Sequence, residues 1–348
     1  MFFWFVFICF LVILSGKYRI SNKPLYREFY LLCFLFVLVI TSLRFDIGFD
    51  YKSYWEMVSN LQIRQEEFHY LEPTMQMFIH LSRIFSYPPL IFFIYALITN
   101  GLFFYLIWKY SGNPMLGLLV YCAFFYLPTL GFIRQGAALA IILSSYPYII
   151  GRKPIKFILI CLLAFLFHYP SLVAIIIYPL YNWISWRKLT TLILATAALF
   201  PLVISTIQAL FPQLSYLHYL ERLNELSGGN MVRMVFLGLI LVIYFIALKK
   251  NLTNELSLIL VSSVGVITSF VLGGHIGGRI GWYFLVFLCI SVPKVLNHYP
   301  SFFRSIASCM FCGIFLSTLY VSTLSKDKLQ YTPYKTIFEI NIEAPRFK

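Results

Sequence analysis

Residues 89–108 read Pro89-Leu-Ile-Phe-Phe-Ile-Tyr-Ala-Leu-Ile-Thr-Asn-Gly-Leu-Phe-Phe-Tyr-Leu-Ile-Trp108, and Lys109 follows directly. This stretch holds 20 residues without a single charge. In an α-helix, 20 residues extend over about 30 Å, which is roughly the thickness of the hydrocarbon core of a bilayer. The stretch therefore predicts a helix that crosses a membrane.

Similar apolar runs recur along the chain, and charged residues or Pro and Gly separate them. They predict an all-α polytopic transmembrane bundle of about 12 spans. The connecting segments are too short for a soluble domain, so residues 1–348 are expected to form a single integral membrane domain. The predicted spans are 2–15, 28–43, 89–108, 114–130, 135–150, 155–167, 170–183, 189–208, 232–248, 255–272, 280–296 and 304–323.

The composition excludes a soluble protein. Hydrophobic residues make up 60% of the chain and charged residues only 11%, and the mean hydropathy is +0.82. A soluble domain has roughly 25% charged residues, because its surface must face water. A surface of that kind cannot be built from this sequence.

The net charge of +14 follows the predicted topology. With the N-terminus outside, the cytoplasmic segments hold 14 basic and only 2 acidic residues, so that side carries +12 of the +14. Cytoplasmic loops of membrane proteins are enriched in Lys and Arg. This rule accounts for the charge, and no nucleic-acid partner is expected.

Two segments depart from simple spans. Basic residues flank both ends of residues 155–183, which predicts a short helical hairpin with its tip at Phe167–Pro170. Its arms are shorter than the bilayer core is thick, so the tip is expected below the outer surface. Residues 73–87 are amphipathic and predict a helix along the outer interface. Glu72-Pro73 precedes this helix and is expected to favour its N-terminus.

A polar segment follows the second predicted span on the outer side. It contains Arg44, Asp46, Asp50, Tyr51 and Tyr54 within eleven residues. Two carboxylates, an arginine and two tyrosines can bind sugar hydroxyls, a phosphate or a cation. The alternative is an ordinary solvated loop with helix caps and turns.

Five further polar positions reach the same face in this topology. Arg134 and Gln135 open the fifth span, and the arginine either snorkels to lipid phosphates or holds an anionic ligand. His168 lies at the sunken hairpin tip, where an imidazole can take a proton from a hydroxyl, although a lone His is often structural. His275 and Arg279 lie in a Gly-rich loop that permits close approach of a bulky ligand.

These residues together resemble the EpsG/Wzy-like family of polysaccharide polymerases. No single motif is specific, but the combination covers nearly the whole chain in order. The matching motifs are Arg44-x-Asp46-x-Gly48-x-Asp50-Tyr51-x-x-Tyr54, Arg134-Gln135-x-x-Ala138, Ala164-x-Leu166-Phe167-His168-x-x-Ser171, Arg279-x-x-x-Tyr283 and Pro333-Tyr334.

The resemblance implies a multi-pass enzyme of the bacterial inner (cytoplasmic) membrane that polymerises lipid-linked repeat units of O-antigen, capsule or exopolysaccharide. It implies a fold like that of GT-C glycosyltransferases, with the active site facing the periplasm or the exterior. The expected partners are undecaprenyl-pyrophosphate-linked oligosaccharides and membrane lipids, with a chain-length regulator as a further candidate.

The chemistry of such a transfer suits the polar residues. A sugar hydroxyl gains from a general base, and a pyrophosphate leaving group gains from arginines that stay charged. We expect Arg44, Arg134 and Arg279 to hold the pyrophosphate. His168, Asp46 and Asp50 are the catalytic candidates, either Asp being an alternative base. The sugar-binding candidates are Tyr51, Tyr54, Gln135 and His275.

Two other functions remain open at this point. A flippase or transporter of the lipid-linked unit would carry charges deep within several spans, whereas the charges here gather at one face. An O-antigen ligase-type transferase would use similar residues but a longer late outer loop. Asp46 and Asp50 lack a third ligand for Mg²⁺ or Mn²⁺, so we expect no metal and no cofactor.

Overall fold

The computed structural model describes residues 7–8, 11–12, 23–59, 70–191, 195, 228–271, 277–324, 331 and 334–339. Within these ranges the secondary structure is helical, apart from one isolated β-bridge between Arg44 and Thr336. The all-α prediction is thereby confirmed. The predicted span 2–15 and most of the span 189–208 lie outside the described residues.

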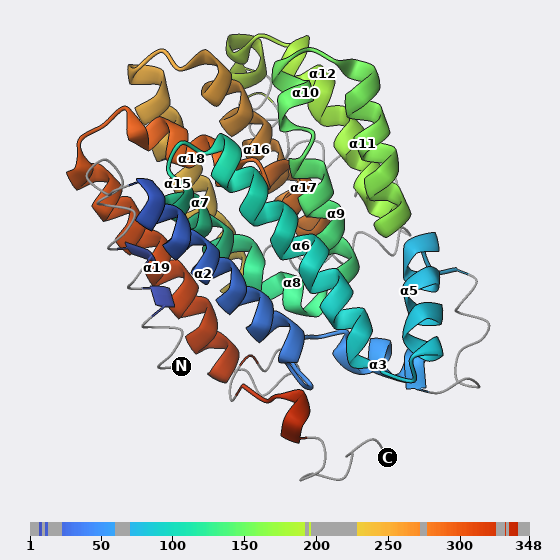
Figure 1. Cartoon of the computed structure of the whole chain (residues 1–348). Helices are drawn as coiled ribbons and strands as arrows, with labels where there is room; N and C mark the ends of the chain where they lie inside the picture. Colours follow the sequence, from blue (N-terminus) through green and yellow to red (C-terminus); the bar gives the residue numbers. More distant parts are fainter. Residues whose placement is uncertain are drawn as a thin grey trace.

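From α5 to α12 and from α15 to α19, most of the described helices follow one another with short connections (Figure 1). Several of them begin with Pro in their first turn, where the missing N–H is not needed. The helices are α2 (Lys23–Leu43), α3 (Tyr51–Ser59), α5 (Pro73–Ile84), α6 (Pro89–Tyr110), α7 (Pro114–Tyr121), the π-helix η1 (Cys122–Tyr126), α8 (Leu127–Gly131), α9 (Ile133–Leu143), α10 (Tyr146–Ile150), α11 (Pro154–Phe167), the 3₁₀-helix η2 (Tyr169–Ile176), α12 (Ile177–Asn182), α15 (Gly228–Lys249), α16 (Thr253–Val271), α17 (Gly278–Leu285), α18 (Leu288–Asn297), α19 (Ser301–Leu324) and the 3₁₀-helix η4 (Ile337–Glu339).

Four helices in the described part of the chain are long and apolar enough to cross a membrane. They are Leu25–Leu43, Pro89–Tyr110, Pro114–Gly131 and Ser301–Val321. The pair α17 and α18, bent by 43°, makes a fifth if it is one broken span. Three further apolar helices are shorter, and α11 is one of them. The chain is therefore a helical membrane protein, but the predicted count of 12 spans is not confirmed.

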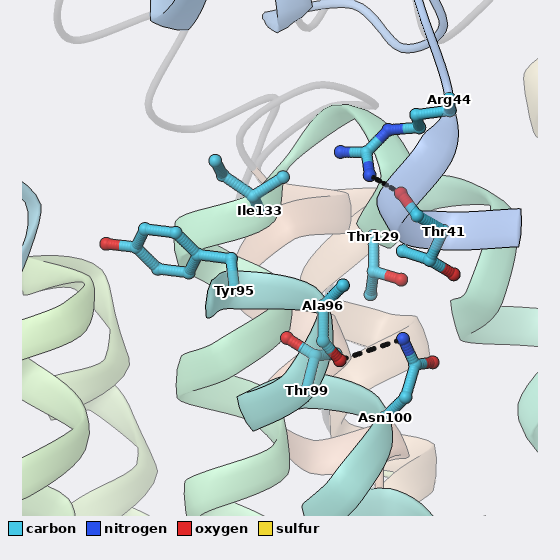
Figure 2. A pocket seen from close by; sticks show the side chains of 8 residues that line it. All are labelled: Thr41, Arg44, Tyr95, Ala96, Thr99, Asn100, Thr129 and Ile133. Carbon is cyan, nitrogen blue, oxygen red and sulfur yellow. Dashed lines mark hydrogen bonds between the residues drawn. The ribbon is translucent and has the colours of Figure 1, made fainter. Parts of the chain in front are cut away.

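A small cavity lies among α2, α6, α8 and α9, near the end of the bundle where α2 stops (Figure 2). Polar side chains line much of it, and Asn100 within it is anchored to the backbone of its own helix. The lining residues are Thr41, Arg44, Tyr95, Ala96, Thr99, Asn100, Thr129 and Ile133.

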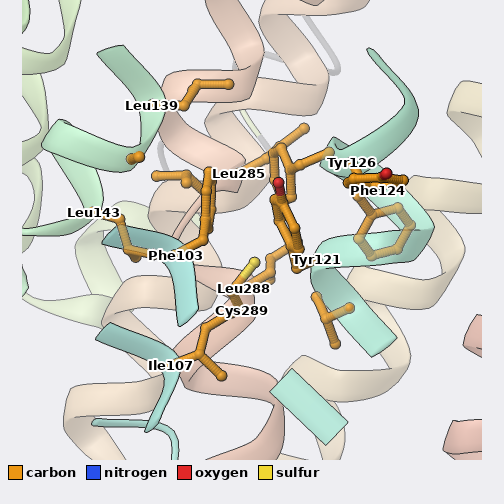
Figure 3. Close-up of a cluster of buried hydrophobic side chains, with 14 of the residues drawn as sticks. Phe103, Ile107, Tyr121, Phe124, Tyr126, Leu139, Leu143, Leu285, Leu288 and Cys289 are labelled. Carbon is orange, nitrogen blue, oxygen red and sulfur yellow. The ribbon is translucent and has the colours of Figure 1, made fainter. Parts of the chain in front are cut away.

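The stretch Pro114–Gly131 is the centre of the bundle, because it is buried along almost its whole length, whereas α2 and α19 are buried on one side only. Phe103 and Tyr121 stack there with ring centroids 4.3 Å apart. Leu139 and Leu285 approach the same cluster from α9 and α17 (Figure 3). This packed core fixes the ends of α6, α9 and α17 relative to one another.

The predicted hairpin is present. The first arm is α11, and the second arm consists of η2 and α12. His168 separates the arms with extended backbone angles, φ −158° and ψ 111°, and ends the helix. The amphipathic segment 73–87 forms α5, which lies beside the lower end of α11 (Figure 1).

Candidate active site

Glu72 is the centre of a polar cluster at the end of the bundle formed by α5, α9 and α11. It is only 3% exposed. Its Oε2 lies 2.5 Å from Nη1 of Arg134, and its Oε1 lies 3.1 Å from Nδ1 of His168. The backbone N–H of Tyr169 donates to the same Oε1 over 3.4 Å. One buried carboxylate thus joins an arginine and a histidine that are distant in sequence.

Local structure brings these three side chains together. Glu72 directly precedes α5, Arg134 lies in the first turn of α9, and His168 directly follows α11. The hydroxyl of Thr74 donates to the carbonyl of Leu166 over 2.8 Å, which ties the start of α5 to the hairpin tip. Because the helix ends before His168, the ring of this residue turns towards Glu72.

The electrostatics hold Glu72 ionised. Burial by itself raises the pKa of this carboxyl, but the hydrogen bond from His168 and the charge of Arg134 outweigh it and lower the pKa to about 2. A buried carboxylate is stable only with such partners. The site therefore keeps a negative charge between two basic side chains throughout the physiological pH range.

Tyr54 and Asp50 extend the cluster towards α3. Nε of Arg134 donates to the hydroxyl of Tyr54 over 3.3 Å, and that hydroxyl donates to Oδ2 of Asp50 over 3.4 Å. Burial raises the pKa of Tyr54 to about 12, so its hydroxyl stays protonated. Asp50 is thus linked to Arg134 through a neutral tyrosine.

Arg279 lies close to the start of α9. Its guanidinium carbon is 4.0 Å from the centroid of the Phe132 ring, a cation–π arrangement. Its backbone carbonyl accepts a hydrogen bond of 2.6 Å from Nε2 of Gln135. Arg134 and Arg279 are therefore brought to the same end of α9. His275 lies outside the described residues.

Arg44 has a different position from the one expected. Its side chain is 1% exposed and donates to the backbone carbonyls of Thr41, Ile47 and Leu130. Figure 2 shows the contact with Thr41. Its guanidinium carbon lies 5.1 Å from the ring centroid of Phe92. The expectation that Arg44 binds pyrophosphate does not fit this geometry, because the guanidinium closes the end of α2 inside the core.

Tyr51 is also a core residue. Its ring stacks on Phe92 with centroids 4.2 Å apart and 7° between the planes, and it is almost fully buried. Stacking of a sugar on this ring does not fit, because both faces are within the packed interior. Asp46 is exposed in the turn before α3 with a φ of 52°, and no hydrogen bond joins it to Glu72 or His168 in the described part of the chain.

Glu72 is the residue that sequence reasoning undervalued. It was expected only to favour the start of α5. The signal was present, since Glu72-Pro73 places a carboxylate at the border of an amphipathic helix, where a solvated role is equally plausible. Its partners are 62 and 96 residues away in sequence, so the pattern around Glu72 does not identify them.

The arrangement suits anion binding combined with proton transfer. Arg134 and Arg279 supply positive charge, and His168 supplies a ring whose orientation Glu72 sets. In the part of the chain that the structure describes, no group of three His, Cys, Asp or Glu side chains is placed to hold a metal ion. The expectation of a metal-independent site stays a prediction.

Comparison with known proteins identifies the family but not the detailed fold. The EpsG family matches residues 27–336. The last matched residues contact the end of α2 and the residues after it. The N–H of Phe45 donates to the carbonyl of Lys335 over 2.9 Å, and the hydroxyl of Tyr334 donates to the carbonyl of Ile40. No curated protein and no solved structure matches, so the likeness to GT-C enzymes stays a prediction. Because the match covers most of the chain, the protein belongs to the EpsG family.

Proposed function

We propose that the protein is a repeat-unit polymerase of a bacterial inner membrane. It transfers an undecaprenyl-pyrophosphate-linked glycan to a sugar hydroxyl of another lipid-linked repeat unit at the outer face. Membership of the EpsG family links the chain to membrane-bound polysaccharide biosynthesis. The observation that carries the proposal is the buried Glu72, which binds Arg134 and His168 at once.

Arg134 and Arg279 bind the donor pyrophosphate in this proposal. Both are arginines, which stay charged and offer several N–H donors to phosphate oxygens. Arg134 uses Nη1 for Glu72 and Nε for Tyr54, so its Nη2 is left for a phosphate oxygen. As the glycosidic bond to phosphate breaks, negative charge grows on the departing oxygen, and the two guanidinium groups stabilise it.

His168 is the proposed general base. When Nδ1 carries a hydrogen and donates it to Glu72, Nε2 keeps its lone pair for the acceptor hydroxyl. The hydroxyl oxygen attacks the anomeric carbon while its proton passes to Nε2. The bond between the anomeric carbon and the phosphate oxygen breaks, and its electron pair leaves with undecaprenyl pyrophosphate. Glu72 stabilises the imidazolium that forms.

Asp50, Tyr54 and Gln135 are proposed to orient the substrates. Tyr54 acts through its hydroxyl, which supports Arg134, and not as a stacking platform, because its ring is buried. Asp50 is half-buried next to this hydroxyl, and its carboxylate can accept a hydrogen bond from a sugar hydroxyl. Asp46 as an alternative base is less well supported, since it is exposed and has no hydrogen bond to the described Glu72 or His168.

Complementation of a polymerase-deletion strain tests the proposal. We expect His168→Ala and Arg279→Ala to abolish long-chain polysaccharide at unchanged protein level in the membrane. The matched controls are His80→Ala on the exposed face of α5 and Arg187→Ala, which is exposed beside Trp186. Both controls should restore wild-type chain length.

Wild-type chain length in both site variants would refute the assignment of the site. A flippase gives a different result, because purified protein would then move lipid-linked units across a vesicle membrane without joining them. Formation of glycan dimers from lipid-linked units by the purified protein in detergent, where there is no second compartment, separates the two functions.

A further inference from the structure

Three buried polar atoms beside the charged site have no hydrogen-bond partner among the described residues. They are Oε1 of Gln135, Oγ of Ser171 and the hydroxyl oxygen of Tyr283. All three side chains are buried. A buried polar atom without a partner destabilises the folded state, so most such atoms in folded proteins have one. Three of them on adjoining elements call for an occupant.

Each of the three atoms belongs to a residue that lies within four positions of a basic residue of the site. Gln135 is the neighbour of Arg134 at the start of α9, and Tyr283 follows Arg279 by four positions in α17. Residues four positions apart share one face of a helix. Gln135 joins the two helices, because its Nε2 donates to the carbonyl of Arg279 in the first turn of α17.

The hairpin contributes the third pair. The N–H of Ser171 donates to the carbonyl of His168 over 2.9 Å, so Ser171 lies one turn beyond the base. The helices α9, η2 and α17 pack against one another. Tyr283 lies within electrostatic range of Glu72, which brings the uncharged group next to the charged one.

The donors and acceptors define the occupant. Oε1 of Gln135 is a carbonyl oxygen and can only accept, while the hydroxyls of Ser171 and Tyr283 both donate and accept. Nε2 of the same amide already donates to the carbonyl of Arg279. An anion other than the pyrophosphate would be repelled by the amide oxygen of Gln135, and a cation would be repelled by Arg134 and Arg279. A neutral hydroxyl group that donates a hydrogen bond to Oε1 of Gln135 and accepts one from Tyr283 satisfies these atoms.

We propose that Gln135, Ser171 and Tyr283 form an uncharged subsite that binds a hydroxyl oxygen beside the charged site. Its occupant is either a sugar hydroxyl of the lipid-linked substrate or an ordered water. The sugar alternative rests on the proposed polymerase function. The subsite explains why an uncharged polar residue accompanies a basic one at the start of α9, at the hairpin tip and in α17.

Variants that lack one oxygen each test the subsite. Tyr283→Phe and Ser171→Ala remove only the hydroxyl, and Tyr320→Phe on exposed α19 is the matched control. The protein is purified in nanodiscs, and its thermal unfolding is measured without substrate. Chain elongation is then measured against the concentration of lipid-linked repeat unit purified from a polymerase-deletion strain.

The two occupants give opposite results. If a sugar hydroxyl binds, both variants raise the KM by about tenfold, because a lost hydrogen bond costs about 1.4 kcal/mol, while Tm is unchanged. If water binds, both variants lower Tm and leave KM unchanged, because the water loses a partner.

An unchanged or higher Tm together with an unchanged KM in both variants would overturn the subsite, since removal of an atom with no partner costs nothing. Failure of the wild-type protein to elongate chains would refute the proposed function instead. The thermal comparison would then still decide whether water occupies the subsite.

Discussion

Replacement of Glu72 by Gln removes one negative charge and keeps the shape of the side chain. In the structure this carboxylate is the shared partner of Arg134 and His168. Glu72→Gln therefore leaves two basic side chains without their anion at a buried position. We expect the variant to be less stable and inactive in polymer formation.

The expected loss of stability follows from the pKa of Glu72. The carboxyl has a pKa of about 2 in the folded protein against an ordinary value of 4.5. Each unit of pKa corresponds to 1.36 kcal/mol, so the charged form gains about 3 kcal/mol on folding. Because Gln keeps one hydrogen bond, and because Arg134 is partly accessible to solvent, we expect a loss of about 2–3 kcal/mol.

The pH dependence has a definite sign. The pKa of Glu72 is lower in the folded state, so its stabilisation is complete above the unfolded pKa of 4.5 and is lost as the pH falls towards 2. The contribution falls from about 3 kcal/mol at pH 7 to about 1.5 kcal/mol at pH 3. The difference in Tm between wild type and Glu72→Gln should shrink accordingly.

Thermal unfolding in nanodiscs at pH 7 and pH 3 measures this difference. At pH 7 we expect Glu72→Gln to unfold about 5 °C below wild type. The control is Glu56→Gln, which breaks an exposed pair with Lys52 at 3.7 Å and should change Tm by less than about 1 °C. Equal Tm for Glu72→Gln and wild type at pH 7, or a difference that does not shrink at pH 3, would refute the reasoning.

Four further results are expected. Arg279→Lys should lower the rate of polymer formation at normal protein level, because Lys does not offer the planar pair of donors that Arg presents to phosphate. Arg44→Ala should destabilise the protein by roughly 3–5 kcal/mol in a thermal or denaturant assay, because three buried carbonyls lose their donor. Gly48→Ala should reduce the yield of folded protein on size-exclusion chromatography, since φ is 107° and the added Cβ would lie 2.5 Å from the carbonyl oxygen of Leu130. Polymer formation by the purified protein should persist in excess EDTA, and its loss with recovery on addition of Mg²⁺ would contradict the expectation of no metal.

Much of the candidate site was predictable, because placing polar residues beside apolar membrane segments costs free energy. Arg134, His168 and Arg279 adjoin apolar helices, and polar groups in such places need a reason. The hairpin was predictable from the basic residues at both of its ends, and His168 does end α11. What remained open was how these residues pair, because spacing along the chain says little about contacts between distant elements.

Arg44 and Glu72 show the limit of such reasoning. Both are charged residues at the border of a helix, Arg44 directly after α2 and Glu72 directly before α5, so their local patterns are alike. Arg44 turns inward onto three backbone carbonyls, whereas Glu72 meets two basic side chains. The difference arises from which segments pack beside each residue, and that is a property of the fold.

Hydropathy and charge, read along the chain, therefore decide that the protein is a helical membrane protein, since transfer of apolar residues out of water depends on composition over about 20 residues. The topology that they predict also places the candidate residues on one face of the membrane. The pairing of Glu72 with Arg134 and His168 spans 62 and 96 residues and depends on the packing of α5, α9 and α11. Only the tertiary structure decides it, because a buried charge is satisfied by whichever partners the packed helices bring within reach.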